Sequence, residues 1–383
     1  MAMEMKKTDI FFILTLVAVV SSCDSHCLSV VSSEFGELST GEQTTLYTLT
    51  NSSGASMTLC DYGARIVSIN VPDRNGDLTD VVVGYGDIAS FEKGRERFMG
   101  CVIGRYANRI NHSSFEIDGV RYEVVPNEKR YGVPVQCHGG PQGFDRFVWD
   151  GEMLEKPGMT GVRFTRLSPD GEQGYPGNLR CSVTYWWTEA NVCRIEYEAV
   201  TDKPTVVNLS NHTVFNLKGP GDRYVMNHIM TVDSDVYVQG NRQLCPDKLL
   251  PVAGSPFDFR EPHRVDYRID DYSNEQFRIA DGMSGCWVIR DWDGSLKKVA
   301  DLYAPETGIG VETWSTEPAF LTFTGRTFDG SETGKYGPME KFCGMLLETF
   351  HLADSPNRPE FPTTELRPDD KFTSVTEWHF YVE

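Results

Sequence analysis

The sequence predicts an all-β protein, a large antiparallel β-sandwich. Apolar and polar residues alternate along many short segments, and turn signals separate these segments. No segment of the sequence shows the longer apolar period of a capped amphipathic helix. Because no repeat, low-complexity tract or linker divides the 383 residues, we expect one large β domain rather than several small ones.

The N-terminus predicts export from the cytosol. Lys6 and Lys7 precede an apolar run, Ile10–Val20, which is too short to span a bilayer and fits a signal peptide of residues 1–22. The segment Val20-Ser-Ser-Cys23 resembles the cleavage box of bacterial lipoproteins, in which Cys23 becomes the lipidated first residue. An ordinary secretory signal is the alternative. Both predict a periplasmic or cell-envelope protein, and lipidation would be its only attachment to a membrane.

After this leader, we expect a short polar tether to Ser33 and a single domain over residues 34–383. Two Gly-containing pairs mark early turns of the domain. Asn75-Gly76 is a turn signal, and Asp118-Gly119 lies between two alternating arms in residues 115–122. The second pair is a strong hairpin signal.

Later segments continue the strand pattern. Residues 193–199 alternate strictly between apolar and polar or charged side chains, as expected for a strand with one face on a core. Two further runs, Val299–Tyr303 and Ile309–Trp314, are separated by Pro305-Glu-Thr-Gly308. This arrangement predicts two antiparallel strands and a turn.

The composition narrows the classes of ligand. The formal net charge is −19 and the pI is near 4.9, which disfavours nucleic acids and anionic lipids as partners. Ten cysteines are scattered without a Cys-x-x-Cys pair, so they predict neither a disulfide scaffold nor a zinc site, although one or two disulfides stay open. No long apolar edge or heptad is present, and we expect a monomer that handles a neutral small molecule.

Four short segments carry residues suited to proton transfer. In chain order they are Gly104–Ile110, Cys137–Gly140, Asn208–His212 and Leu346–Phe350. They supply Arg109, His138, His212 and Glu348. In a sandwich, residues far apart in sequence can meet at one rim or concave face. Together these residue types predict acid/base chemistry on a carbohydrate.

From about Phe35 onward, the chain resembles the aldose 1-epimerases, the galactose mutarotase family. Besides the four segments, the matching motifs are Asp61-Tyr-Gly-Ala-Arg65, His138–Asp145, Ser168–Gly177 and Phe215-Asn-Leu-Lys-Gly219. The resemblance implies a mutarotase-like supersandwich. It also implies an isomerase that interconverts the α and β anomers of an aldohexose by opening and closing the ring, with no required cofactor or metal.

The resemblance assigns Glu348 as the catalytic base and His212 as the acid. A carboxylate is ionised at neutral pH, and an imidazole near its ordinary pKa of ~6.5 can supply a proton. Glu348 follows an apolar run, and a buried strand does not readily hold an unpaired charge, which favours a functional role. His212 could equally be a hydrogen-bonded core histidine.

Arg109, Asn108 and His138 are candidate substrate-binding residues. The Arg109 guanidinium can bind a pair of sugar hydroxyls, although a salt bridge is an equal explanation, and Asn108 can add an amide contact. His138 precedes two glycines, which let the backbone approach a ligand. By resemblance, His138 either holds the sugar or shares the acid role.

Two departures from the family pattern affect recognition. Ser284 stands where the family carries a sugar-binding Asp, and Leu321 stands where it carries an amide. Both positions are therefore candidate substrate-binding residues with altered chemistry. We expect weak binding of ordinary galactose, or a different preferred sugar.

Several alternatives stay open. A lipid-anchored carbohydrate-binding protein with little turnover would use the same scaffold. An epimerase for a phosphorylated or uronic sugar would need basic groups, for which Arg326 is the single candidate. A zinc site rests on composition alone, and a bound Ca²⁺ is compatible with the acidic chain, but no motif locates one.

Overall fold

The computed structural model describes residues 28–220, 224–280 and 282–383. This part of the chain is built almost entirely of antiparallel strands. Its two α-helices, α1 (Ile88–Lys93) and α2 (Glu275–Ala280), are six residues long each. The structure therefore confirms the predicted all-β class.

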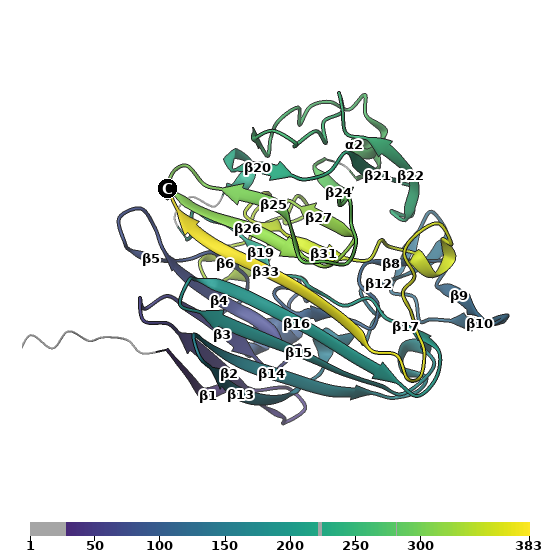
Figure 1. Ribbon diagram of the computed structural model, residues 1–383, viewed down its shortest axis with the longest axis horizontal. Coiled ribbons are helices and arrows are strands. Elements are labelled where there is room, and N and C mark those ends of the chain that lie inside the picture. Colours follow the sequence, from purple (N-terminus) through teal and green to yellow (C-terminus); the bar gives the residue numbers. More distant parts are fainter. Residues whose placement is uncertain (1–27, 221–223, 281) are drawn as a thin grey trace, which may run out of the picture.

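A long antiparallel sheet of nine strands runs diagonally across the molecule (Figure 1). Its order is β13 (Asp150–Lys156), β14 (Met159–Ser168), β15 (Leu179–Thr188), β16 (Val192–Thr201), β33 (Phe372–Val382), β26 (Ile309–Ser315), β25 (Lys297–Tyr303), β20 (Ile229–Val232) and β23 (His263–Arg264). The C-terminal strand β33 lies between β16 and β26, so the last residues of the chain join the two halves of the sheet.

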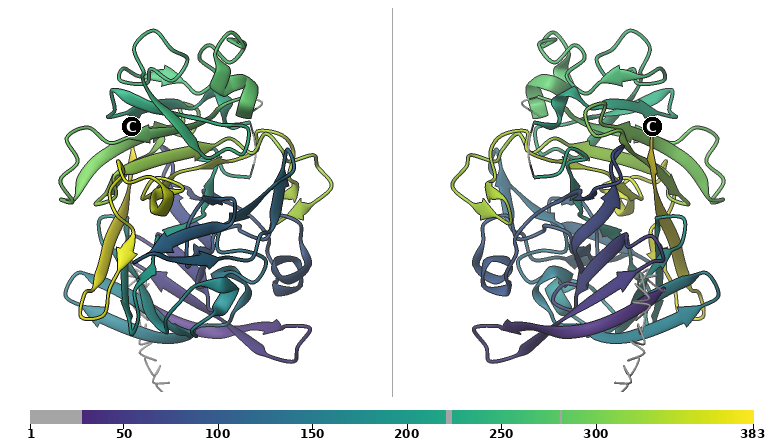
Figure 2. Two further views of the ribbon diagram at one scale, coloured as in Figure 1. Left: turned by 90° about the vertical axis from the view of Figure 1, so that its right-hand side faces the viewer. Right: turned by 90° about the vertical axis from the view of Figure 1, so that its left-hand side faces the viewer.

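Two five-stranded sheets pack on the inner side of the long sheet. The first contains β1 (Ser29–Glu37), β2 (Gln43–Thr50), β3 (Ser56–Cys60), β4 (Arg65–Pro72) and β5 (Leu78–Asp80). The second has the order β22 (Pro246–Pro251), β21 (Val236–Gly240), β24 (Ser284–Val288), β27 (Ala319–Phe323) and β31 (Glu348–Phe350). They occupy opposite ends of the molecule, the first at the bottom and the second towards the top of Figures 1 and 2.

One continuous hydrophobic core joins these layers. Tyr47 of the first small sheet meets Phe164 of the long sheet edge to face, with ring centroids 5.5 Å apart. Trp287 of the second small sheet belongs to the same core, together with Leu302 and Val311 of the long sheet. The layers thus form the expected sandwich, and β31 lies inside it rather than at its outer surface.

Short strands complete the structure between the layers. They are β6 (Val82–Val83), β7 (Val102–Ile103), β8 (Arg109–Asn111), β9 (Ser114–Ile117), β10 (Val120–Glu123), β11 (Glu128–Arg130), β12 (Val133–Cys137), β17 (Thr205–Val206), β18 (Ser210–Asn211), β19 (Val214–Phe215), β28 (Thr333–Gly334), β29 (Gly337–Pro338), β30 (Met345–Leu346) and β32 (Glu365–Leu366). Their pairings bring distant segments together, as when β18 pairs with β7 and β12 with β8.

The predicted turns are present. Asp118 and Gly119 have φ values of 51° and 76°, as the tight hairpin between β9 and β10 requires. Asn75-Gly76 connects β4 to β5, and residues 305–308 connect β25 to β26. Residues 193–199 lie in β16, whose side chains alternate between buried and partly exposed.

The expected N-terminal boundary needs correction. Strand β1 begins at Ser29 and pairs with β2 from its first residue, so residues 29–33 belong to the sheet and not to a tether. The predicted signal peptide and Cys23 lie outside the described residues. Across the described ranges, no helix is long and apolar enough to cross a membrane. The cysteines from Cys60 to Cys343 are free thiols, and all of them except Cys286 are buried.

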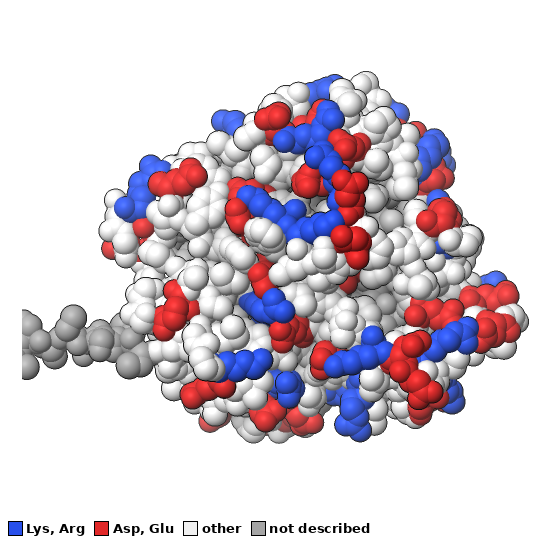
Figure 3. Space-filling view, viewed as in Figure 1, with Lys and Arg blue, Asp and Glu red and all other residues white. Residues whose placement is uncertain are grey.

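Charged side chains of both signs are interspersed on the outer face of the long sheet (Figure 3). Arg194 pairs with Glu377 of the neighbouring strand, and Lys298 pairs with Glu312 at 2.6 Å. Because the acidic residues on this face alternate with basic ones, the net negative charge does not gather there into one patch.

Candidate active site

Glu348 begins β31 and lies directly opposite Leu321 of β27. Only 1% of Glu348 is exposed, and neither carboxylate oxygen has a hydrogen-bond partner among the described residues. The nearby Ser210 hydroxyl donates instead to the carbonyl of Thr349, at 2.9 Å. A buried carboxylate without a partner is costly to the fold, so this side chain is kept for a reason other than stability.

The strand explains where Glu348 points. Successive side chains of a strand face opposite sides, so Glu348 and Phe350 share one face and Thr349 takes the other. Thr349 bonds Thr376 of the long sheet at 2.7 Å. Burial raises the pKa of Glu348, while His138, the neighbouring Ser210 hydroxyl and, more weakly, Arg109 oppose the rise. The result is a stronger base than an exposed glutamate.

His138 and His212 meet beside this carboxylate. Their ring centroids are 5.1 Å apart, and their planes are nearly perpendicular at 88°. His138 follows β12 and has a φ of 51°. At Gly139, a Cβ would lie 1.9 Å from the Gly104 carbonyl oxygen, so only glycine fits there. His212 follows β18, where its backbone bonds Gly100 and Cys101 at 2.9 Å.

Both neutral imidazoles carry their proton on Nε2. The Asn108 backbone N–H donates to Nδ1 of His138 at 3.3 Å, which makes that nitrogen an acceptor. Nδ1 of His212 is buried and has no partner within the described chain. Leaving an acceptor unpaired costs less than burying an unpaired N–H, so the proton is assigned to Nε2 there too. The site therefore offers two N–H donors and one carboxylate acceptor.

Both histidines are partly exposed, but the loss of surrounding water is large enough to keep them neutral. Desolvation, followed by repulsion from His138, lowers the pKa of His212 to about 3. Desolvation also lowers the pKa of His138, against the attraction of Glu348. The pKa of ~6.5 from which the acid role of His212 was argued is thus not the value in the folded protein.

Phe98 packs against both imidazoles, a contact that the sequence motifs did not reveal. Its ring centroid lies 4.9 Å from that of His138 and 5.9 Å from that of His212. The Arg97 guanidinium lies over the Phe98 ring, 4.6 Å from its centroid, and also forms an ion pair with Asp145 at 2.7 Å. Phe98 thus shields the histidines from water. No spacing or motif marks it, because its role depends on tertiary contact alone.

Arg109 is both an ion-pair residue and a site residue. Its Nε and Nη2 donate to the two carboxylate oxygens of Glu128, each at 3.1 Å. Nη1 makes only a long contact of 3.5 Å to the Asn108 side chain. Although burial raises the pKa of Glu128, attraction to Arg109 and contacts with Arg130 lower it to about 2. Glu128 therefore fixes the guanidinium, a function that the sequence motifs did not indicate.

A cavity of about 520 Å³ extends from this cluster. The predicted binding residues Asn108, Arg109, Ser284 and Leu321 all line it. Glu348 is contiguous with its wall, because Leu321 is its cross-strand neighbour and Phe350 also lines the cavity. Four of the seven predicted site residues thus line the pocket. The other three are connected to its wall, Glu348 through Leu321, His138 through Asn108, and His212 through His138.

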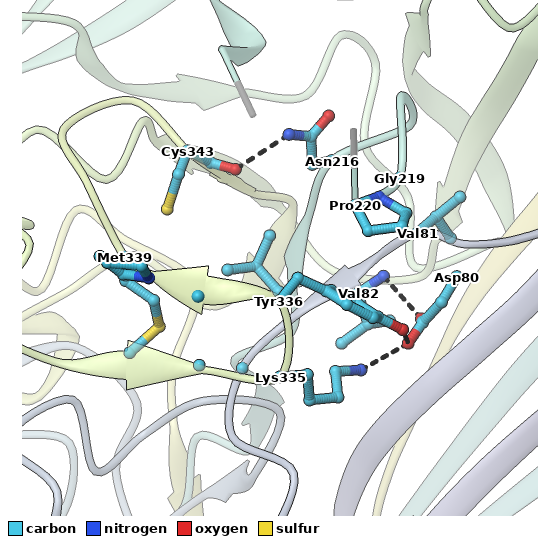
Figure 4. A pocket seen from close by; sticks show the side chains of 15 residues that line it. Asp80, Val81, Val82, Asn216, Gly219, Pro220, Lys335, Tyr336, Met339 and Cys343 are labelled. Atoms are coloured by element: carbon cyan, nitrogen blue, oxygen red, sulfur yellow. Dashed lines mark hydrogen bonds and ion pairs between the residues drawn. The ribbon is translucent and has the colours of Figure 1, made fainter. Parts of the chain in front are cut away.

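A separate cavity of about 350 Å³ lies between β6 and the β28–β29 hairpin (Figure 4). Asp80 accepts hydrogen bonds there from Lys335 at 2.6 Å and Tyr336 at 2.7 Å. None of the predicted site residues lines this cavity. The charged groups of this cavity pair with each other, as expected for contacts that hold the β28–β29 hairpin against the rest of the fold. Within the described ranges, no three His, Cys, Asp or Glu side chains gather to hold a metal ion.

The pocket, bordered by a buried carboxylate without a hydrogen-bond partner in the described chain and by two imidazoles in contact, defines a site for proton transfer on a small polar ligand. The sequence model of the aldose 1-epimerase family matches residues 45–379. The chain therefore belongs to the aldose 1-epimerase family, as the sequence predicted, and it is an isomerase of that family.

Relatives of established name match along nearly their whole length. The galactose mutarotase of Mus musculus is 33% identical, over 93% of this chain and 99% of the relative. The aldose 1-epimerase of Escherichia coli K12 is also 33% identical, over 90% and 97%.

Solved structures agree with the fold. A GalM/aldose epimerase homologue from C. elegans superimposes with a TM-score of 0.76 at 26% identity, covering 86% of this chain and 96% of its own. A galactose 1-epimerase from Lactobacillus acidophilus gives a TM-score of 0.80 at 23% identity, covering 93% and 99%. The mutarotase-like architecture is confirmed.

Proposed function

We propose that this protein interconverts the α and β anomers of an aldohexose, with Glu348 as the base and His212 as the proton donor. Glu348 removes the proton of the anomeric hydroxyl, and the ring bond between C1 and O5 breaks. His212 Nε2 delivers a proton to O5, which completes the open-chain aldehyde. Rotation about C1–C2 and the reverse steps on the other face of the carbonyl give the second anomer.

The observation that carries this proposal is the partnerless Glu348 carboxylate beside the two imidazoles. Its raised pKa suits a base that works near neutral pH. A neutral imidazole can act as an electrophile towards an oxygen that becomes negative, provided its N–H is held in place. The packing of His212 against Phe98 supplies that constraint.

The other residues bind and orient the sugar. His138 presents a second Nε2–H, fixed by the Asn108 amide. Arg109 is held by Glu128 and lines the pocket, and its Nη1 takes no part in that ion pair. With the ring oriented in this way, much of the barrier can be removed by positioning. The proposed chemistry assigns no step to a metal or cofactor.

The test is the relaxation of optical rotation after dissolving crystalline α-glucose or α-galactose. The protein should accelerate the relaxation, and Glu348→Gln should abolish the acceleration while sugar binding persists. Glu317→Gln is the matched control, because Glu317 is also buried, at 2% exposed, but pairs with His351 away from the pocket. An unchanged rate in Glu348→Gln would show that the base is misassigned. Sugar binding without acceleration by the wild-type protein would favour the carbohydrate-binding alternative.

The cellular location is proposed from the leader. Lys6, Lys7, the apolar run Ile10–Val20 and Cys23 are consistent with an exported monomer anchored in the cell envelope by lipid on Cys23. Metabolic labelling with a fatty acid, followed by fractionation, tests this. Cys23→Ser should lose both the label and the membrane fraction if Cys23 is lipidated.

A further inference from the structure

Phe98 contacts both imidazoles from a segment without regular secondary structure. Residues 97–100 form a turn that belongs to no strand or helix, and Phe98 is only partly buried there. Arg65 fixes the backbone of this turn by donating to the Met99 carbonyl at 3.0 Å. The Phe98 side chain packs on a small apolar cluster that includes Cys101 and Ile103. These contacts leave part of the Phe98 side chain uncovered.

Arg97 adds a charged contact to the Phe98 ring. Its guanidinium carbon lies 4.6 Å from the ring centroid. A guanidinium at this distance is attracted to the π face of an aromatic ring, and its flat shape stacks there better than an ammonium does. The residue that precedes Phe98 in the chain therefore also restricts the position of its ring.

The same guanidinium is bound to a second segment of the site. Nε and Nη2 donate to the two Asp145 carboxylate oxygens, at 2.8 and 2.7 Å. Nη1 donates to the Pro141 carbonyl at 2.9 Å, and Nη2 also donates to the Gly140 carbonyl at 3.2 Å. Gly140 and Pro141 belong to the loop that begins at His138. Arg97 thus joins the Phe98 ring to the loop that carries His138.

Asp145 adds a buried charge to this group of contacts. It lies in the short 3₁₀ helix η1 (Phe144–Arg146) and is 1% exposed. Two cations compensate this charge, Arg97 at 2.7 Å and, less closely, Arg146 at 3.4 Å. A buried carboxylate that loses its nearer counter-ion keeps a charge that is poorly compensated.

The charge of Asp145 acts on His138. Loss of surrounding water is the main influence on the His138 pKa and lowers it. The charged groups that also act on this imidazole come from four elements, and they are Glu348, Arg109, Glu128 and Asp145. Like the two glutamates, Asp145 favours the protonated ring. The neighbouring His212 ring is neutral. By pairing with Asp145, Arg97 helps to keep His138 neutral.

We propose that Arg97 is a positioning residue of this epimerase, which holds the Phe98 ring and the His138 loop together and neutralises Asp145. The inference rests on the proposed function, in which both imidazoles act as neutral N–H donors. Four of the five N–H groups of Arg97 are engaged by the protein. Arg97 therefore acts through the histidines and not by contact with the sugar.

Arg97→Gln tests this role, with Arg166→Gln as the matched control. Arg166 also forms a two-point ion pair, with Glu172 at 2.8 and 2.9 Å, and its guanidinium lies 4.0 Å from the Phe147 ring centroid. It lines a cavity on the long sheet that contains none of the site residues. A displaced catalytic group can cost ~10² in rate, so Arg97→Gln should lower kcat/KM roughly ten- to hundredfold, and Arg166→Gln should stay within about twofold of wild type. Equal losses in the two variants would overturn the inference.

Titration of His138 by NMR separates positioning from stability. In Arg97→Gln, the uncompensated Asp145 should raise the His138 pKa. Adding Asp145→Asn removes the second charge and should bring this pKa back down. The activity should then recover only in part, because the contacts to the Phe98 ring and to the loop carbonyls stay lost. A merely structural role would lower stability without moving the titration, so an unmoved His138 pKa in Arg97→Gln would overturn the inference.

Arg97→Lys keeps the test available if Arg97→Gln does not fold. Lysine keeps a positive charge beside Asp145 but cannot form the planar set of bonds to the carboxylate and the two carbonyls. The His138 pKa should then stay near the wild-type value, while kcat/KM should fall at least about threefold. A wild-type kcat/KM in Arg97→Lys would overturn the inference.

Failure of the function is distinguishable from failure of this inference. If the wild-type protein accelerates the relaxation of no sugar, the epimerase proposal fails, and the histidine titrations still decide the role of Arg97. A His138 pKa that rises in Arg97→Gln and returns with Asp145→Asn would retain the control of His138 by Arg97. An unchanged pKa would reject it as well.

Discussion

The imidazoles of His138 and His212 lie nearly perpendicular with their centroids 5.1 Å apart, and His138 discourages His212 from taking a second proton. Together with burial, which acts on both rings, this holds them neutral at pH 7. The ionisable groups of the site are thus separated in function: Glu348 titrates as the base, and the histidines act as N–H donors throughout the neutral range.

The pH dependence of activity should show this separation. Glu348 must be ionised, so kcat/KM should rise with pH through its raised pKa, above the ordinary 4.5. It should then stay level once Glu348 is ionised, because His212, with a pKa of about 3, is already neutral. Initial rates at low sugar concentration, with buffer catalysis subtracted, measure the profile. A fall in kcat/KM centred near pH 6.5 would mean that an imidazolium is the acid.

Two replacements of His212 distinguish a neutral N–H donor from a group that must take up and release a proton. His212→Ala should lower kcat by ~10²–10⁴, the usual value of a positioned acid–base group. His212→Gln keeps an N–H donor of similar reach and should retain more activity than His212→Ala. Single-turnover exchange rates make the comparison independent of product release. Equal losses in the two variants would argue against the neutral N–H role.

Phe98→Ala should admit water to both imidazoles. Because desolvation is the main cause of the low pKa of His212, removal of the ring that lies 5.9 Å away should raise this pKa towards ~6.5. We expect a loss of kcat and an acidic limb that moves up towards about pH 6.5, because the neutral form of His212 is then populated only above its raised pKa. NMR titration of the histidine ring protons measures the shift, and Phe98→Tyr, which keeps an aromatic ring, is the control.

Sequence patterns predicted those strands and turns whose formation depends only on residues close together in the chain. The Asp118-Gly119 hairpin and strand β16 need only turn chemistry and alternation. The identity of Arg109, His138 and Glu348 as neighbours came from motif resemblance. The resemblance did not predict the chemistry of these residues. The pKa of His212 depends on burial by Phe98, and the ion pair of Arg109 with Glu128 depends on the register between β11 and β12. The pairing of Leu321 with Glu348 and Cys286 likewise follows from sheet register, which alternation within a single strand cannot specify.

Loss of the ion pair in the second cavity should lower stability without lowering the epimerase activity. Lys335 donates to Asp80 and to the Val67 carbonyl, each at 2.6 Å, and both side chains of the pair are nearly buried. Lys335→Met should destabilise the protein by about 3 kcal/mol, because it leaves the Asp80 charge buried without its counter-ion. Urea unfolding measures this loss, and Asp80→Asn in the same chain should recover part of it. Additive effects of the two changes would show that the pair is not coupled.

Glu348→Gln should stabilise the fold at the pH where it destroys activity. Burial raises the folded-state pKa of Glu348 above its unfolded value of about 4.5, so the folded protein is favoured by the protonated carboxyl. That contribution is complete below pH 4.5 and is lost as the pH rises through the folded pKa. Glutamine stays neutral and does not lose it. The variant should therefore gain stability relative to wild type above pH 4.5, by an amount that grows until the pH passes the folded pKa and is constant beyond it. Urea unfolding at several pH values measures the difference, with Glu317→Gln as the comparison, since Glu317 is paired with His351 and removal of a paired charge should not stabilise.

A difference independent of pH would mean that Glu348 has the same pKa in the folded and unfolded chains. The carboxylate would then not carry the desolvation on which its role as a base depends.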